Sequence, residues 1–150
     1  MKVLIQVVKK ANVKVNNKKI AKIKEGYVLF VGFSFSDKKE TIDKMVEKIV
    51  NLRILPDKSG KVNLNISQKF NSLISVPQFT LYANSKKGNR PSFTESLSPI
   101  KAKELFDYFN KKLSDNKKIL VQEGEFGASM LVSLKNTGPF TIMLDSEHIF

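Results

Sequence analysis

Few residues in this sequence are of a type that could carry chemistry. It contains no cysteine and a single histidine, His148, close to its last residue. Thiolate nucleophiles, thiolate metal sites and disulfides are therefore excluded, and a histidine-built metal site is implausible. The sequence also lacks the Gly-x-Ser-x-Gly motif and the glycine-rich phosphate loops. We expect no metal and no cofactor, so an enzyme built from these residues must work through backbone dipoles, hydroxyl groups and positioning.

One candidate segment, Val76–Tyr82, combines polar and aromatic residues at the end of an apolar run. Side chains alternate along a strand, which would place Gln78 and Thr80 on one face and Phe79 on the other. The competing interpretation is an ordinary strand with two polar positions.

Two further segments interrupt the apolar pattern later in the chain. The basic stretch Lys86–Phe93 predicts a loop, and a solvated loop without function is the simpler interpretation. In Asn136–Thr141, the pair Gly138-Pro139 predicts a turn between two strands, and a plain hairpin connection would explain it. None of the three segments identifies a function by itself.

Hydrophobic periodicity predicts the elements that must position these segments. The expected helices are an N-terminal one capped at Ser36-Asp37 and ending near residue 52, and a second from Pro99 to about 113. The expected strands are 2–8 with a continuation to 15, 18–24, 27–33, 72–82, 118–124, 129–135 and 140–145. We therefore predict one α+β domain, residues 1–150, with a curved antiparallel sheet or barrel and two main helices packed outside it.

The charge of the chain is strongly positive, at +12, and only two of its 26 basic residues are arginines. A polyanionic partner would explain this charge, and so would a nucleotide bias that favours lysine codons. Lysines occur in almost every expected element, so no local RNA-binding patch is predicted. No apolar run is long enough to span a bilayer and no signal peptide is evident, so we expect a cytoplasmic protein with no membrane contact.

Sequence blocks spread along the chain carry a family resemblance when they are taken together and in order. They are Met1–Val8, Leu52–Ile54, Gln78–Leu81, Lys87–Phe93, Phe126–Met130, Asn136–Thr141 and Leu144–Ser146. With these blocks the chain resembles the D-aminoacyl-tRNA deacylase family over essentially its full length.

The resemblance implies a hydrolase that cleaves the ester between a D-amino acid and its tRNA. It implies a homodimer in which each site is lined by the Gln-Phe-Thr strand of one subunit, while Gly138-Pro139 of the other subunit reaches in. In the family this Gly-Pro peptide is cis, and its carbonyls exclude the side chain of an L-amino acid. D-aminoacyl and glycyl esters would be admitted, which amounts to chiral proofreading in translation.

The roles of individual residues stay open between alternatives. Thr80 is either a nucleophile or a residue that shapes the site, and we favour the second because no base is adjacent in sequence. Gln78 and Phe79 would bound the pocket and supply part of the oxyanion environment. Lys87 and Arg90 are candidates to contact tRNA, although Arg90 could equally anchor its own loop.

Two residues depart from the family pattern. Pro77 stands where the family usually has a serine before the Gln-Phe-Thr strand, and a proline there favours a sheet edge or a bulge. Phe140 stands where valine is common and could alter the rim of the pocket. A non-enzymatic RNA-binding module and a structural dimer remain the alternative functions, and the first is disfavoured by the lack of interleaved exposed aromatics.

Overall fold

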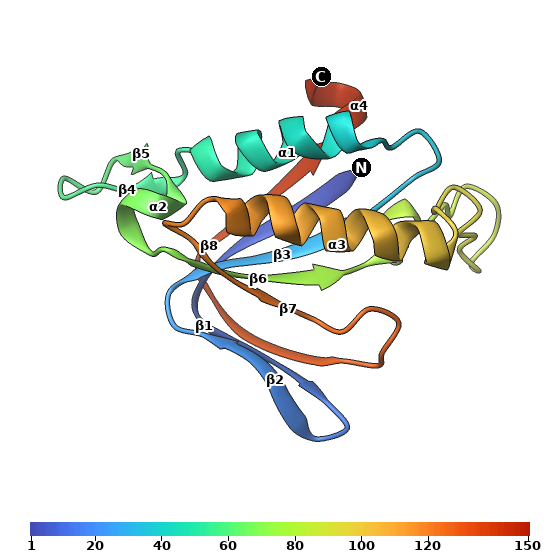
Figure 1. Ribbon diagram of the computed structural model, residues 1–150, viewed down its shortest axis with the longest axis horizontal. Coiled ribbons are helices and arrows are strands. Elements are labelled where there is room, and N and C mark those ends of the chain that lie inside the picture. The colour runs from blue at the N-terminus through green and yellow to red at the C-terminus, as the bar shows by residue number, and fades with distance from the viewer.

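The long, strongly bent strand β1 (Lys2–Val15) organises the molecule, because three other strands pair with it (Figure 1). The computed structural model describes residues 1–150. Its elements are β1 (Lys2–Val15), β2 (Lys18–Ile23), β3 (Gly26–Gly32), α1 (Lys39–Asn51), β4 (Leu55–Pro56), β5 (Val62–Leu64), α2 (Ile66–Lys69), β6 (Ser72–Pro77), the 3-10 helix η1 (Phe79–Tyr82), α3 (Pro99–Asp115), β7 (Leu120–Glu123), β8 (Leu131–Asp145) and α4 (Ser146–Ile149).

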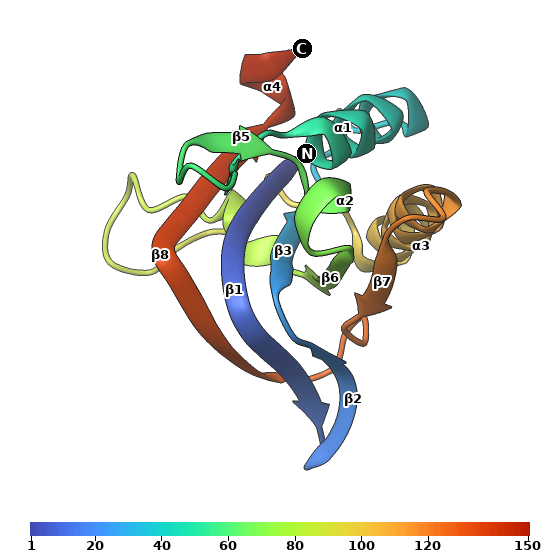
Figure 2. The ribbon, with the colours of Figure 1, turned by 90° about the vertical axis from the view of Figure 1, so that its left-hand side faces the viewer.

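The main sheet has the strand order β2-β1-β3-β6-β7, and β8 pairs along β1 as well. The pairs of β1 with β2, β3 and β8 are antiparallel, as expected. The pairs β3–β6 and β6–β7 are parallel, so the expected antiparallel pairing is confirmed only for the pairs that β1 makes. Parallel neighbours require long crossover connections, and here α1 and α3 lie within those connections. The sheet curls until it is nearly closed (Figure 2).

The core is divided between the two ends of β1. Val3, Ile5 and Val7 belong to the main apolar cluster, which α1 and α3 cover, whereas Val8 and Val13 belong to a second cluster beneath β2. Val7 and Val8 are both buried, so the alternation of buried and exposed side chains along β1 is interrupted there. The register of β1 with β8 shifts at the same place. The α+β class with a curved sheet and two outer helices is therefore confirmed.

The start of the first helix differs from the expectation. Helix α1 begins after Lys38, and neither Ser36 nor Asp37 caps it. The Asp37 carboxylate instead accepts a 2.7 Å hydrogen bond from the Ser34 N–H and pairs with the N-terminal ammonium group of Met1. Helix α3 does begin with Pro99 at its first position, as expected. None of the helices is both long and apolar enough to cross a membrane.

Candidate functional site

The chain turns sharply at the end of β6, where sequence periodicity predicted a strand through Tyr82. The strand ends at Pro77, and residues Phe79–Tyr82 form η1 instead. Gly32 on β3 permits this turn, because a Cβ atom there would lie 2.8 Å from the Gln78 carbonyl oxygen. The Gln78 N–H completes the junction by donating a 2.8 Å hydrogen bond to the Val31 carbonyl. The expected strand faces for Gln78, Phe79 and Thr80 are therefore wrong.

Pro77 itself occupies a position that tolerates its missing N–H. It is the last residue of β6, and pairing with β7 has already ended at Ser75. β6 is an inner strand and Pro77 still pairs with Val31 of β3, so neither a sheet edge nor a bulge is found; Pro77 only lacks a partner on the β7 side.

The side chains of Gln78 and Thr80 nevertheless meet. The Gln78 amide Nε2 donates a short hydrogen bond to the Thr80 hydroxyl oxygen, and this is the only hydrogen bond of the Thr80 side chain. A neutral amide does not take up a proton at neutral pH, so no general base contacts the Thr80 hydroxyl. Phe79 is 57% exposed and stacks edge-on against Phe93, with ring centroids 5.0 Å apart.

A cavity of about 600 Å³ opens beside this turn. It lies at the carboxyl ends of the parallel strands β3 and β6, a common place for ligands in sheets of this kind. Gln78 and Phe79 line it, whereas Thr80 does not. The other lining residues are Val31, Gly32, Phe33, Val76, Pro77, Phe93, Ser96, Leu97, Ser98, Pro99, Ala102, Phe126, Gly127, Ala128, Met130 and Val132.

No lining residue of the cavity is titratable. Its polar groups are the side chains of Gln78, Ser96 and Ser98 and the backbone. The Glu123 carboxylate lies at the end of β7, outside the lining, and burial raises its pKa. Nowhere in the chain do three or more His, Asp or Glu side chains gather as metal ligands would. The side chains of this chain therefore offer neutral hydrogen-bonding groups to the cavity.

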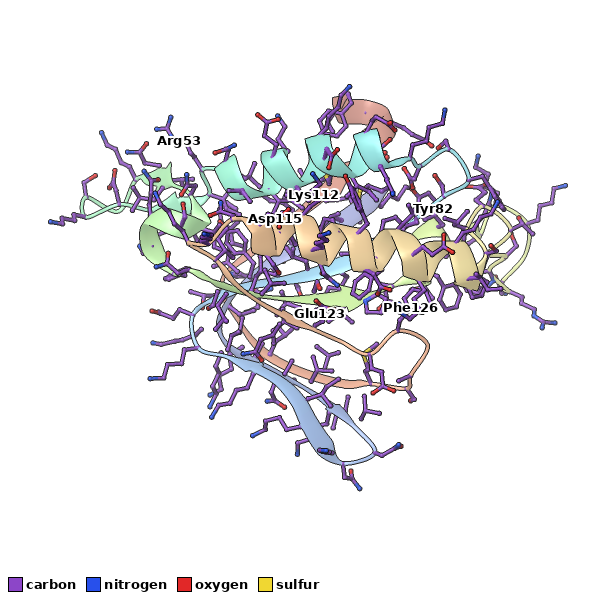
Figure 3. The ribbon with its side chains drawn as sticks, viewed as in Figure 1. Arg53, Tyr82, Lys112, Asp115, Glu123 and Phe126 are labelled. Atoms are coloured by element: carbon purple, nitrogen blue, oxygen red, sulfur yellow. The ribbon has the colours of Figure 1, made fainter.

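Part of the cavity wall comes from the β7–β8 connection, which was not among the predicted site residues. Phe126 lies beside α3 (Figure 3), with its ring centroid 6.0 Å from that of Phe106. Gly127, Ala128 and Met130 continue the wall. The signal for this segment was available in the sequence, because the Phe-Gly-Ala-x-Met block is one of those that carry the family resemblance.

The segment around Gly138-Pro139 is a bulge within one strand, so the expected turn between two strands is wrong. β8 runs unbroken from Leu131 to Asp145. Its register with β1 passes from Val8↔Asn136 directly to Gln6↔Thr141, which leaves residues 137–140 opposite a single residue. Such insertions project a backbone segment away from the ladder. Gly138 and Pro139 are both exposed, and the peptide bond between them is cis.

Side chains at the base of the bulge hold it in place. The Asn136 Oδ1 atom accepts a 3.2 Å hydrogen bond from the Phe140 N–H, and the Asn136 Nδ2 atom donates to the Thr141 hydroxyl at 3.2 Å. Gln6 on β1 donates to the same hydroxyl at 3.3 Å. The Phe140 ring packs against the main core, so it does not reach the cavity rim of its own chain.

The bulge and the cavity are separate within one chain. None of residues 136–141 lines the cavity. In Figure 1 the bend of β8 lies left of centre, whereas η1 and the loop after it lie at the right. A site that uses both features would need two chains.

Lys87 and Arg90 lie in the exposed loop that follows η1. Neither side chain forms an ion pair or a hydrogen bond to another residue, so Arg90 does not anchor its loop. Asn84 anchors the loop instead. Its backbone forms two hydrogen bonds with the Ser92 backbone, of 2.8 and 2.9 Å, and its side-chain amide donates a hydrogen bond to the Glu95 carboxylate. Both cations are therefore free to meet a ligand.

Comparison with known proteins gives this geometry a context. The sequence profile of the family described as D-Tyr-tRNA(Tyr) deacylase matches residues 4–145. A Lactobacillus gasseri protein called D-aminoacyl-tRNA deacylase is 50% identical over 145 residues, which are 97% of this chain and 99% of that protein. A Kosmotoga olearia protein of the same name is 47% identical over 150 residues, the full length of both chains.

Solved structures share the fold. A protein described as c-Myc DNA Unwinding Element Binding Protein superposes with a TM-score of 0.91 at 35% identity, covering 97% of this chain and 98% of its own. A probable eukaryotic D-amino acid tRNA deacylase superposes with a TM-score of 0.80 at 17% identity, covering 95% of this chain and 97% of its own. The likeness extends over the whole sequence and the whole fold, and the chain therefore belongs to the D-Tyr-tRNA(Tyr) deacylase family.

Proposed function

We propose that this protein hydrolyses the ester that joins a D-amino acid to its tRNA. Family membership over residues 4–145 supports this activity. The observation that carries it is the neutral, largely apolar cavity at the turn between β6 and η1, lined by Gln78 and Phe79. An aminoacyl ester is already activated, so its hydrolysis needs placement, a water molecule and stabilisation of the oxyanion rather than a strong base.

The chemical groups that the cavity offers are hydrogen-bond donors. The N–H groups of Phe79 and Thr80 lie in the first turn of η1, where a helix has no internal partners for them. Together with the Gln78 side chain they would stabilise the tetrahedral oxyanion. The substrate's own ribose hydroxyl would assist the attacking water. Thr80 would hold the Gln78 amide in place, and the absence of a base at its hydroxyl argues against a nucleophilic role.

The selection of D-substrates would depend on a second subunit. In this proposal the protein is a homodimer, and Gly138-Pro139 of one subunit enters the cavity of the other. The support is that the bulge is exposed, is held at its base by hydrogen bonds of Asn136, and does not line the cavity of its own chain. Its backbone would clash with an L side chain and leave room for D-aminoacyl and glycyl esters, which would make the protein a cytoplasmic proofreading enzyme of translation.

Filling the cavity tests whether it is the site of hydrolysis. Ala128→Phe should abolish release of free tRNA from D-tyrosyl-tRNA, because Ala128 lines the cavity. Ser129→Phe is the matched control, since Ser129 is exposed and lies outside the lining. Full activity of a folded Ala128→Phe variant would refute the assignment of the cavity. Binding of D-tyrosyl-tRNA by the wild-type protein without hydrolysis would favour a non-enzymatic RNA-binding module.

A further inference from the structure

The positive charge of the chain is concentrated at its beginning. The first 24 residues contain eight lysines and no acidic residue, and Glu25 is the first carboxylate. This segment therefore supplies eight of the twelve net positive charges. The spread of lysines over almost every element did not reveal this concentration, because it took no account of where the acidic residues are.

Strand pairing brings several of these lysines onto one surface. Lys14 of β1 stands directly opposite Lys19 of β2, and Lys10 of β1 stands opposite Lys135 of β8. Lys22 of β2 stands opposite Asn12 of β1, which lies between Lys10 and Lys14 on the same side of the strand. We call this surface the lysine face, defined by Lys10, Lys14, Lys19, Lys22 and Lys135.

The lysine face has no internal counter-ions. None of the five side chains takes part in an ion pair of the chain. Like charges directly opposite each other across a ladder are destabilising. On helix α3 a neighbouring carboxylate balances a lysine, as in the ion pair Lys103–Asp107. On the lysine face an external polyanion would have to supply the balancing negative charge.

The opposite side of the same strands leads to the cavity. The alternate residues Ala11, Val13 and Ile23 are buried in the second apolar cluster, so the lysines must point outward. Met130 and Val132 pack against that cluster and also line the cavity. In both ribbon views the β1–β2 hairpin lies next to the β7–β8 connection that forms the cavity wall (Figures 1 and 2).

We propose that the lysine face binds the phosphate backbone of the tRNA whose aminoacylated end enters the cavity. This inference rests on the proposed function for the identity of the RNA. Lysine ammonium groups are point charges that bind phosphates without reading bases. The surface therefore recognises the tRNA backbone independently of its sequence.

A second role for these lysines would be purely structural. β2 is an edge strand of the main sheet, and lysines on edge strands prevent pairing with other chains. However, the Lys22 N–H already donates a 2.6 Å hydrogen bond to the Gln122 side chain, so part of this edge is covered within the chain. β8 pairs only with β1 and is an edge strand too, so edge protection would also explain Lys135. It gives no reason for Lys10 and Lys14, because β1 is paired on both sides.

Charge-neutral variants test the proposal. The hairpin variant replaces Lys10, Lys14, Lys19 and Lys22 by Gln. The matched control replaces Lys38, Lys58, Lys111 and Lys117 by Gln; these lysines are exposed, lie outside the lysine face, and give the same net charge. The hairpin variant should raise KM for D-tyrosyl-tRNA by about tenfold or more and leave kcat unchanged. The logarithmic slope of its affinity against salt concentration should become shallower by roughly 0.7–0.9 for each tRNA phosphate that the variant no longer binds.

Two further measurements make the outcome decisive. Hydrolysis of D-tyrosyl-adenosine, an ester without phosphates, should be equal in the wild type and the hairpin variant. Direct binding of tRNA without an attached amino acid should weaken only in the hairpin variant. This binding measurement remains valid even if the wild type hydrolyses no ester. Absence of hydrolysis would refute the proposed function and leave the inference about the lysine face standing. Equal tRNA affinity of hairpin and control variants would overturn the inference. Aggregation of the hairpin variant with an unchanged KM would assign the lysines to edge protection, and binding of anionic phospholipid vesicles without an effect on tRNA would assign them to membranes.

Discussion

At the scale of single residues, the hydrogen bond from Gln78 to Thr80 is the most informative contact of the site. It uses the Thr80 hydroxyl as an acceptor, and it holds the amide of Gln78, a residue that lines the cavity. A nucleophilic hydroxyl needs a partner that accepts its proton, and the lining of the cavity holds no titratable side chain. The residues therefore favour a mechanism in which Thr80 positions Gln78.

Replacement of Thr80 separates the two mechanisms. We expect Thr80→Ala to reduce kcat by no more than about tenfold, because the oxyanion donors and the substrate hydroxyl remain. Loss of a true nucleophile would reduce kcat by roughly 10⁴-fold or more. Single-turnover hydrolysis of D-tyrosyl-tRNA measures this difference, with Thr80→Ser as the control that would preserve a nucleophile. A folded Thr80→Ala protein without detectable turnover would restore the acyl-enzyme mechanism.

At the scale of elements, sequence periodicity predicted the two main helices and most strands to within a few residues. It failed at the two segments that the proposed site uses. The strand through Tyr82 was expected from alternation, but Gly32 on another strand allows the chain to turn after Pro77. The turn at Gly138-Pro139 was expected from local residue types, but pairing with β1 on both sides keeps β8 continuous. Both failures come from contacts between distant parts of the chain, which a local pattern does not contain.

The bulge in β8 makes a prediction of its own. Gly138 has φ of +113°, which L-residues with a Cβ rarely adopt, and a Cβ there would lie 3.0 Å from the Phe140 N–H nitrogen. We expect Gly138→Ala to distort the bulge and sharply reduce D-tyrosyl-tRNA hydrolysis. The melting temperature should change little, because residues 137–140 lie outside the β1 register. Gly60→Ala is the matched control, at an exposed positive-φ glycine far from the site in sequence. Unchanged kcat/KM in a Gly138→Ala protein with a distorted bulge would remove the bulge from the mechanism.

At the scale of the whole molecule, the cavity and the bulge become one site only if two chains associate. The family resemblance supplied this expectation, and the separation of the two features within one chain agrees with it. A two-fold dimer would place two such sites symmetrically, each with parts from both subunits.

Subunit mixing tests the shared site. Gln78→Ala and Gly138→Ala subunits should each form dimers of twice the 17.0 kDa chain mass with little activity. Mixed dimers contain one intact site, built from Gly138 of the first variant and Gln78 of the second. After random exchange the mixture should recover about one quarter of the wild-type activity, since about half the dimers are mixed and each has one working site. No recovery in a mixture shown by mass spectrometry to contain mixed dimers would contradict a site shared between subunits.

One comparison tests whether this protein hydrolyses aminoacyl-tRNA with selection for the D-configuration. D-tyrosyl-tRNA and L-tyrosyl-tRNA are prepared with the same tRNA, and the release of free tRNA by the wild-type protein is followed under identical conditions. We predict efficient hydrolysis of the D-ester and survival of the L-ester at enzyme concentrations that consume the D-ester completely. Equal rates on the two esters, or no hydrolysis of either, would contradict the account.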